Sequence, residues 1–416
     1  MLTHTRFASF LFAVALTVPV AALRAANERN ASMSSPETAR SGTVPIDLRD
    51  NRVFVDLTVI GADGSPRKAR FQIDSGGGAV ILSESLSDDL GLKKSGPVSK
   101  EEGQSFQSVS APQIRIGKMT LDLTGAAVIV AVGSKNEFTP GSGSEGFLPA
   151  RVLRKYEVVF DYPAHKFTIA QPGVLKPRGT AVPSPIGEKS GFPRIELTVG
   201  GEKYGFLLDT GGAYTMISQA LITKWRAAHP EWPHCTGAAG AANMIGGPFD
   251  AKVELLRVPE MRWGTFDLRG AGVVSRPEGI FEKYMSSMMS APIVGSIAGN
   301  VLRVFRVQID YVHGMTYLEK YSDVDAHDLD TVGVIIGARP DGSYIIGGVV
   351  KRDGKNVVQG VEAGDKLVRI GDWKVTGATL ADVLRELRGR PGETKTLALD
   401  RQGKPVTVNV VVSSLM

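Results

Sequence analysis

The sequence is short of cysteine and has no cluster of basic residues. Cys235 is the only cysteine among 416 residues, so the chain cannot form an internal disulfide and must be held by packing and hydrogen bonds. Lysine and arginine are interspersed with acidic residues, and the net charge is only +5, without the basic run that tracks a phosphate backbone. The absence of a basic run argues against a nucleic-acid partner. The length of the chain predicts two or three domains.

The N-terminal residues have the pattern of a secretory signal peptide. A short positive start is followed by an almost entirely apolar stretch at residues 7–23 and by small residues up to Ala26. The apolar stretch is interrupted by Pro19 and is short for a membrane-spanning helix, although a membrane anchor is the alternative. No lipobox cysteine is present, so a lipid anchor is not expected. We therefore expect residues 1–26 to be removed on export.

Residues 27–43 are rich in serine, glutamate and asparagine, and we expect a disordered linker there. An exported protein without disulfides fits a bacterial envelope better than a eukaryotic secreted protein. We expect the mature protein to be periplasmic or secreted, with no stable membrane span after the signal peptide is cleaved.

The following part of the chain has the alternation of β-strands. Residues 53–59 alternate apolar and polar side chains as a half-buried strand does, and the Ala-Asp-Gly turn at 62–64 separates them from a second strand at 69–73. Helical patterns are short, as at residues 83–90. The chain up to about residue 320 is therefore predicted to be mainly β.

An internal repeat divides this β region into two lobes. The stretch FQIDSGGGAVILS at 71–83 returns as FLLDTGGAYTMIS at 206–218. A second pair, VLRKYEVVFDY at 152–162 and VLRVFRVQIDY at 301–311, follows the two copies in the same order. We expect two duplicated β-barrel lobes at 44–175 and 176–322.

The repeat decides between two interpretations of the motif Asp74-Ser75-Gly76. A trypsin-type nucleophile at Ser75 would need a general-base histidine ahead of it, and only His4, within the signal peptide, precedes it. The second copy keeps the aspartate, as Asp209, and replaces the serine by Thr210. The chemistry is therefore assigned to the aspartates.

Two such turns, one from each lobe, are expected to form one catalytic site. Carboxylates held in contact cannot both ionise easily, so they share a proton. The ionised one can take a proton from water while the protonated one donates to the scissile carbonyl, without a covalent intermediate. Gly76 and Gly211 allow tight turns. We expect the hydroxyls of Ser75 and Thr210 to hydrogen-bond across the lobe interface.

Residues 44–322 resemble the retropepsin-like aspartic proteases of bacteria, in a fused two-lobe, pepsin-like arrangement. The resemblance rests on Asp74-Ser75-Gly76, Asp209-Thr210-Gly211 and the later Ile293-Val294-Gly295 with Val301-Leu302. It implies that Asp74 and Asp209 are the catalytic pair and that Ser75, Gly76, Thr210 and Gly211 support the turns. Two features depart from the family pattern: Ser144-Glu145-Gly146 stands where the first lobe should have two apolar residues and Gly, and Gly77 and Gly212 stand where Ala or Ser is usual.

The family also implies a flap over the site. Candidates are Gln104–Ala111, with Phe106 in place of the flap tyrosine of pepsins, and the glycine-rich Thr236–Gly247, which could equally be an ordinary surface loop.

Other polar clusters are expected to have no catalytic role. His229, His234 and Cys235 lie close together, but no fourth ligand is evident, so we expect neither a metal nor another cofactor. Asp161 and Asp310 each precede a tyrosine in a hairpin-like turn and are expected to be turn formers.

The composition shifts after about Thr331. Residues 325–416 resemble an α+β PDZ domain of the bacterial type, through Gly364-Asp365-Lys366-Leu367, Ile370-Gly371-Asp372 and Arg401-Gln402-Gly403. The resemblance implies that peptide C-termini or unfolded segments bind between a strand and a helix, at Gly333, Val334 and Leu380. The alternative is a domain that only packs against the lobes.

The sequence therefore predicts a mainly β, exported aspartic-type endopeptidase that acts on polypeptides and carries a C-terminal PDZ domain. The alternative is a catalytically weak protein of the same fold that binds peptides or serves as a scaffold.

Overall fold

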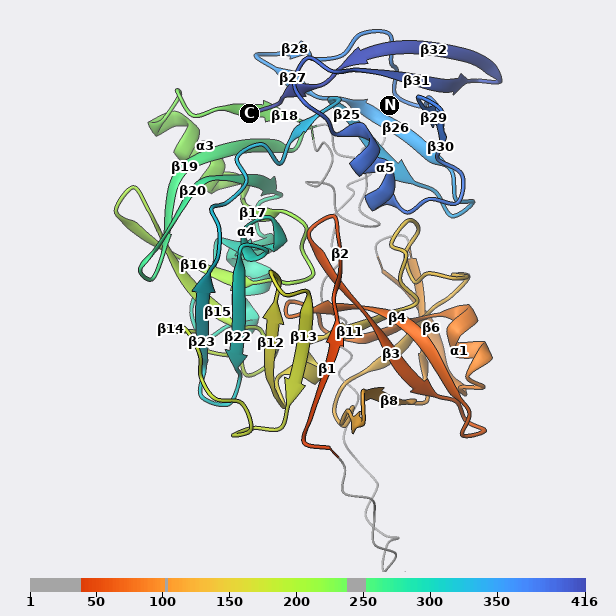
Figure 1. Ribbon diagram of the computed structural model, residues 1–416, viewed down its shortest axis with the longest axis vertical. Helices are drawn as coiled ribbons and strands as arrows, with labels where there is room; N and C mark the ends of the chain where they lie inside the picture. The colour runs from red at the N-terminus through yellow and green to blue at the C-terminus, as the bar shows by residue number, and fades with distance from the viewer. Residues whose placement is uncertain (1–38, 102–103, 238–251) are drawn as a thin grey trace, which may run out of the picture.

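A computed structural model describes residues 39–101, 104–237 and 252–416, nearly half of them in β-strands (Figure 1). The expected signal peptide and most of the expected linker lie outside these ranges. The prediction of a disordered linker was wrong for residues 41–43, because they belong to β1 (Ser41–Pro45), which pairs with β13 (Lys166–Ala170). No helix within the described ranges is long and apolar enough to cross a membrane.

The first repeat copy lies in a ten-stranded sheet. Its central feature is β11, which runs parallel to β4 on one side and antiparallel to β5 on the other. In spatial order the strands are β6 (Lys94–Glu101), β7 (Gln104–Val109), β10 (Val128–Ala131), β5 (Val80–Ser83), β11 (Gly146–Pro149), β4 (Pro66–Asp74), β3 (Arg52–Ile60), β8 (Gln113–Ile116) and β9 (Met119–Thr120), with β2 (Asp47–Arg49) paired to β3.

The second copy has the same local arrangement in a nine-stranded sheet, where β21 runs parallel to β16 and antiparallel to β17. The spatial order is β15 (Arg194–Val199), β16 (Glu202–Leu208), β21 (Gly295–Ile297), β17 (Thr215–Ser218), β20 (Phe266–Arg276), β19 (Glu254–Trp263), β18 (His234–Thr236), β27 (Lys351–Arg352) and β28 (Lys355–Asn356).

The serine that ends each repeat copy caps a helix. The side chain of Ser83 accepts a hydrogen bond from the Leu86 amide at the start of α1 (Glu84–Asp89), and Ser218 accepts one from Leu221 in α3 (Gln219–Ala228). Serine is preferred at this position because its oxygen satisfies an amide that has no partner inside the helix. The recurring serine therefore fixes the end of the strand and the start of the helix in both copies.

A six-stranded sheet joins the two halves. Its central pair is β12 (Glu157–Asp161) from the first half and β22 (Phe305–Asp310) from the second, which run antiparallel. The spatial order across this sheet is β1, β13, β12, β22, β23 (Met315–Lys320) and β14 (Thr180–Pro183). Two short helices, α2 (Ala150–Leu153) and α4 (Gly299–Leu302), precede the central strands, and a π-helical turn at Ile280–Met285 runs into a 3₁₀ turn at Ser286–Met288.

The C-terminal part packs its own apolar core between a sheet and helix α5 (Leu380–Leu387). The sheet order is β25 (Val334–Ala338), β26 (Tyr344–Val349), β29 (Lys366–Ile370), β31 (Thr394–Arg401) and β32 (Lys404–Val411), with β30 (Trp373–Lys374) paired to β29. β24 (Asp330–Thr331) pairs with β33 (Ser413–Ser414). This part is not separate from the rest, because β18 pairs with β27.

Candidate active site

The two Asp-Ser/Thr-Gly turns face each other where the two halves meet. Asp74 is the last residue of β4, and Asp209 directly follows β16. Both carboxyls are buried, with exposed fractions of 1% and 0%. A β-carbon on Gly211 would overlap the carboxyl group of Asp74, and one on Gly76 would lie 3.3 Å from the carboxyl carbon of Asp209. Only glycine therefore fits at 211 beside the opposite carboxyl, whereas a side chain at 76 would require its neighbours to shift slightly.

Reciprocal hydrogen bonds hold the turns together. The Ser75 amide donates to Oγ1 of Thr210, and the Thr210 amide donates to Oγ of Ser75, both at 3.0 Å. The hydroxyls then donate to backbone carbonyls of the opposite half: Ser75 to Leu208 at 2.6 Å, and Thr210 to Ile73 at 3.1 Å. The expectation that these hydroxyls hydrogen-bond across the interface is confirmed.

The two carboxyls do not have equal partners. Oδ1 of Asp209 accepts hydrogen bonds from the amides of Gly211 at 3.0 Å and Gly212 at 2.9 Å. Oδ1 of Asp74 accepts one from the Gly76 amide. Donors to a carboxylate stabilise its charged form, so these contacts favour charge on Asp209.

The pKa values follow the same asymmetry. Burial, and then the nearby charge of Asp209, raise the pKa of Asp74 well above its usual range, although the Gly76 and Gly211 amides oppose them. Burial also raises the pKa of Asp209, but the Gly212 and Gly211 amides oppose that effect. The carboxyls titrate as a pair, and the unequal amide donors favour charge on Asp209 and the proton on Asp74.

The departure at Ser144-Glu145-Gly146 leaves the packing behind the first turn intact. Gly146 lies beside Phe71, and Gly295 lies beside Phe206 in the same register; a β-carbon on either glycine would overlap the phenylalanine ring. The Ser144 hydroxyl is satisfied by the carbonyls of Arg70 and Gly146, at 3.0 and 2.7 Å. The polar residues that replace the apolar pair are therefore accommodated.

Two tyrosines near the site were missed by the sequence analysis. Tyr162 and Tyr311 follow β12 and β22, are buried, and have hydroxyls without a hydrogen-bond partner among the described residues. Burial raises both pKa values; the charge of Asp209 adds to the effect at Tyr162, and that of Asp74 at Tyr311. The signal was available, because the tyrosine recurs in both repeat copies together with the aspartate before it.

Those preceding aspartates are turn formers, as expected. Oδ1 of Asp161 accepts a hydrogen bond from the Ala164 amide, and Oδ1 of Asp310 accepts one from the His313 amide, both at 3.0 Å.

The first flap candidate, Gln104–Ala111, contains β7, and Phe106 is buried against Ala79 and Phe138. The second, Thr236–Gly247, lies mostly outside the described residues.

The two histidines of the histidine and cysteine cluster have separate partners. The His229 ring stacks on Trp232 with centroids 4.2 Å apart, and His234 contacts Arg226 through Nε2 at 2.9 Å. Burial raises the pKa of the Cys235 thiol to about 12. Within the described ranges, no three histidine, cysteine or acidic side chains are grouped as metal ligands.

The three residues expected to bind peptide are buried. Gly333 and Val334 lie at the start of β25, and Leu380 begins α5. The Leu380 amide donates to the carbonyl of Gly141, in a loop of the first half, at 3.0 Å. In this structure that end of the helix is engaged by the rest of the chain.

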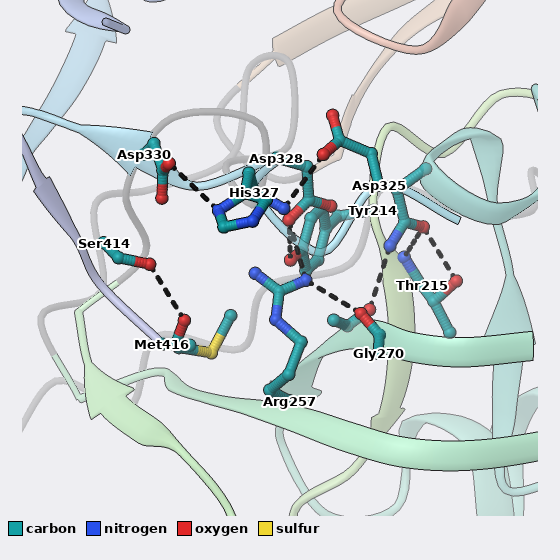
Figure 2. A network of polar contacts seen from close by, with 12 residues as sticks. Tyr214, Thr215, Arg257, Gly270, Asp325, His327, Asp328, Asp330, Ser414 and Met416 are labelled. Atoms are coloured by element: carbon teal, nitrogen blue, oxygen red, sulfur yellow. Dashed lines mark hydrogen bonds and ion pairs between the residues drawn. The ribbon is translucent and has the colours of Figure 1, made fainter. Parts of the chain in front are cut away.

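A buried ionic network, also missed from the sequence, ties the connecting segment before β24 to the second turn (Figure 2). Tyr214, five residues after Asp209, donates to Oδ1 of Asp328 at 3.1 Å. Nη1 of Arg257 donates to the same oxygen at 2.8 Å and to the Gly270 carbonyl at 3.1 Å (Figure 2). The carboxylate of Asp328 is 1% exposed, so its charge depends on Arg257 for compensation.

No protein-family profile and no curated protein sequence matches the chain. Among solved structures, the chain is similar to an aspartic proteinase from Irpex lacteus, at 14% sequence identity and a TM-score of 0.40. The alignment covers 69% of this chain and 99% of that one. The interpretation of the site therefore rests on its own geometry.

Proposed function

We propose that the protein is an aspartic-type endopeptidase in which Asp74 and Asp209 activate a water molecule. The observation that carries the proposal is the pairing of two Asp-hydroxyl-Gly turns, held face to face by reciprocal hydrogen bonds between Ser75 and Thr210. A pair of buried carboxyls in contact supplies one base and one acid at the same time.

The unequal partners of the carboxyls support a division of roles. Ionised Asp209 removes a proton from water as its oxygen attacks the peptide carbonyl carbon, and Asp74 gives its proton to the carbonyl oxygen. The new C–O bond yields a tetrahedral diol, with Asp209 protonated and Asp74 ionised. The C–N bond then breaks as the nitrogen takes the proton from Asp209, and one diol hydroxyl returns a proton to Asp74. Both carboxyls are thereby restored without a covalent intermediate.

The proposed architecture is two duplicated, pepsin-like lobes at 44–175 and 176–322. It is supported by the matching strand triads around β11 and β21 and by the pairing of β12 with β22. The residues from 325 are proposed to form a PDZ domain. In its support, Arg401 donates to both carboxylate oxygens of Asp365 at 2.8 Å, which ties together two of the three motifs of the resemblance.

The proposed substrates are polypeptides, and the proposed location is the bacterial envelope or the exterior, in accord with the apolar N-terminal stretch and the single cysteine. A peptide that binds beside α5 would have to displace the Gly141 contact. We therefore propose that binding at Gly333, Val334 and Leu380 requires this end of the helix to be released.

The test is cleavage of a denatured protein by the purified chain without residues 1–26, from about pH 3 to about pH 7. Pepstatin and the variants Asp74→Asn and Asp209→Asn serve as controls. We expect cleavage that pepstatin and each variant abolish. Binding of the denatured protein without cleavage at any pH would contradict the proposal and favour a peptide-binding protein.

A further inference from the structure

The two repeat copies differ at the residue after the backing glycine. In the second half this residue is Ser296, which lies opposite Leu207 in the parallel pairing of β16 and β21. In the first half it is Phe147, which lies opposite Gln72 in the corresponding pairing of β4 and β11. Leu207 and Gln72 each stand two residues before a catalytic aspartate, so Ser296 and Phe147 occupy equivalent positions.

The hydroxyl of Ser296 is a candidate donor to the Asp209 carboxylate. Ser296 is fully buried, and neither its Oγ nor Oδ2 of Asp209 makes a well-formed hydrogen bond to any of the described residues. Ser296 pairs with Leu207, and residues two apart in a strand share a face, so its side chain lies on the face from which Asp209 projects; its hydroxyl also lowers the pKa of Asp209. Gly212 has no side chain to offer this oxygen a donor. The Asp209 carboxyl also contacts that of Asp74, so the Ser296 hydroxyl is the second side-chain donor available to it, and the hydroxyl itself has no other partner among the described residues.

The first half offers the corresponding carboxyl an aromatic ring instead. A β-carbon on Gly77 would overlap the ring of Phe147 and would lie 3.2 Å from Oδ2 of Asp74. The ring packs edge-on against Phe138, with centroids 5.7 Å apart. A ring in this place excludes water from Asp74 and donates nothing to its charged form.

We propose that Ser296 is a positioning residue that donates a hydrogen bond to Oδ2 of Asp209, and that the contrast between Ser296 and Phe147 keeps the charge on Asp209 and the proton on Asp74. The inference rests on the proposed function and deepens it, because it assigns the acid and the base to particular lobes through side chains outside the two motifs.

Other titratable groups that act on the pair are Tyr162, on the side of Asp209, and Tyr311, on the side of Asp74. Burial raises both phenol pKa values, so both tyrosines stay neutral wherever the carboxyls titrate. The asymmetry therefore depends on the residues at 147 and 296 and on the glycine amides.

The test compares Ser296→Ala and Ser296→Thr with the parental protein in the pH dependence of kcat/KM. Loss of the donor destabilises ionised Asp209, so we expect the acidic limb to move to higher pH, with roughly ten-fold lower kcat/KM on that limb and little change at the optimum. KM should stay unchanged, and Ser296→Thr should restore the profile. Ser275→Ala is the matched control, because Ser275 is a buried serine of the same sheet whose hydroxyl accepts the Glu254 amide.

An unchanged profile in Ser296→Ala, or the same shift in Ser275→Ala, would overturn the proposal. Carboxyl ¹³C titration of Asp209 by NMR, in the parental protein and in Ser296→Ala, separates this inference from the proposed function. If the parental protein cleaves nothing, the endopeptidase proposal fails. The NMR comparison then still decides whether Ser296 holds the carboxylate, since equal titration curves would refute it.

Discussion

The substitution Thr210→Val tests the contact between the two turns without changing the shape of the side chain. Valine keeps the volume and branching of threonine but replaces the hydroxyl by a methyl group. Two buried backbone groups then lose their partners: the Ser75 amide and the Ile73 carbonyl. Neither group can turn to solvent, because Thr210 and its surroundings are fully buried.

The expected cost follows from those two groups. A buried donor or acceptor left without a partner costs about 1–3 kcal/mol, so the pair predicts a loss of roughly 3 kcal/mol in the free energy of unfolding. For a domain of this size, 1 kcal/mol corresponds to about 2–4 °C in Tm, so Thr210→Val should melt roughly 6–12 °C below the parental protein. Catalysis should fall as well, because the turns position both carboxyls.

Differential scanning calorimetry measures the melting temperature, and Thr198→Val is the matched control. Thr198 is half-buried on β15, the strand next to β16, away from the turns. We expect this variant to melt within about 2 °C of the parental protein, as is usual for substitutions outside such networks. Equal melting temperatures for Thr210→Val and Thr198→Val would refute the argument that the reciprocal bonds hold the halves together.

Three further outcomes follow from buried charges. Asp74→Asn and Asp209→Asn should each abolish turnover, and the double variant should be hardly worse, since the carboxyls act as a unit; parental rates in both folded single variants would exclude the mechanism. The folded pKa of Asp74 lies above its unfolded value, so the contribution of this carboxyl to stability is full in acid and is lost as pH rises through the folded pKa. Asp74→Asn should therefore melt above the parental protein near neutral pH and at the same temperature in acid. Thermal unfolding at both pH values checks this. Arg257→Met should cost about 3–5 kcal/mol by leaving Asp328 uncompensated, and adding Asp328→Asn should recover part of that loss in urea unfolding; equal stability of the two variants would contradict the role of the ion pair.

The parts of the site that the sequence predicted are those that recur within it. Ser75 and Thr210 stand at the same place in two copies of one motif, so a symmetric contact between them follows once the copies are assumed to face each other. The recurring Ser83 and Ser218 were visible as well, and both are helix caps. Tyr162 and Tyr311 recur in the same way, so the repeat also carried the signal for these two buried side chains.

The parts that the sequence left open depend on contacts between distant segments. Asp328 lies 71 residues after Arg257, and neither stands in a motif. Ser41 and Thr43 look like linker residues because β1 is an edge strand with an exposed, polar face. Val334 and Leu380 are apolar whether a peptide or the rest of the chain covers them, so their composition could not predict the Gly141 contact.

A duplicated chain can give its two aspartates different surroundings, and here the difference lies one residue beyond each motif. The turns already favour charge on Asp209, because two glycine amides donate to its Oδ1 and one donates to that of Asp74. Phe147 and Ser296 add to that difference: one excludes water and the other supplies a hydroxyl. An acid and a base are needed in the same step. A proton fixed on Asp74 keeps Asp74 as the acid and Asp209 as the base before each attack. The substitution Ser296→Ala therefore tests whether the free protein already determines which carboxyl is the acid and which is the base, or whether only substrate binding determines it.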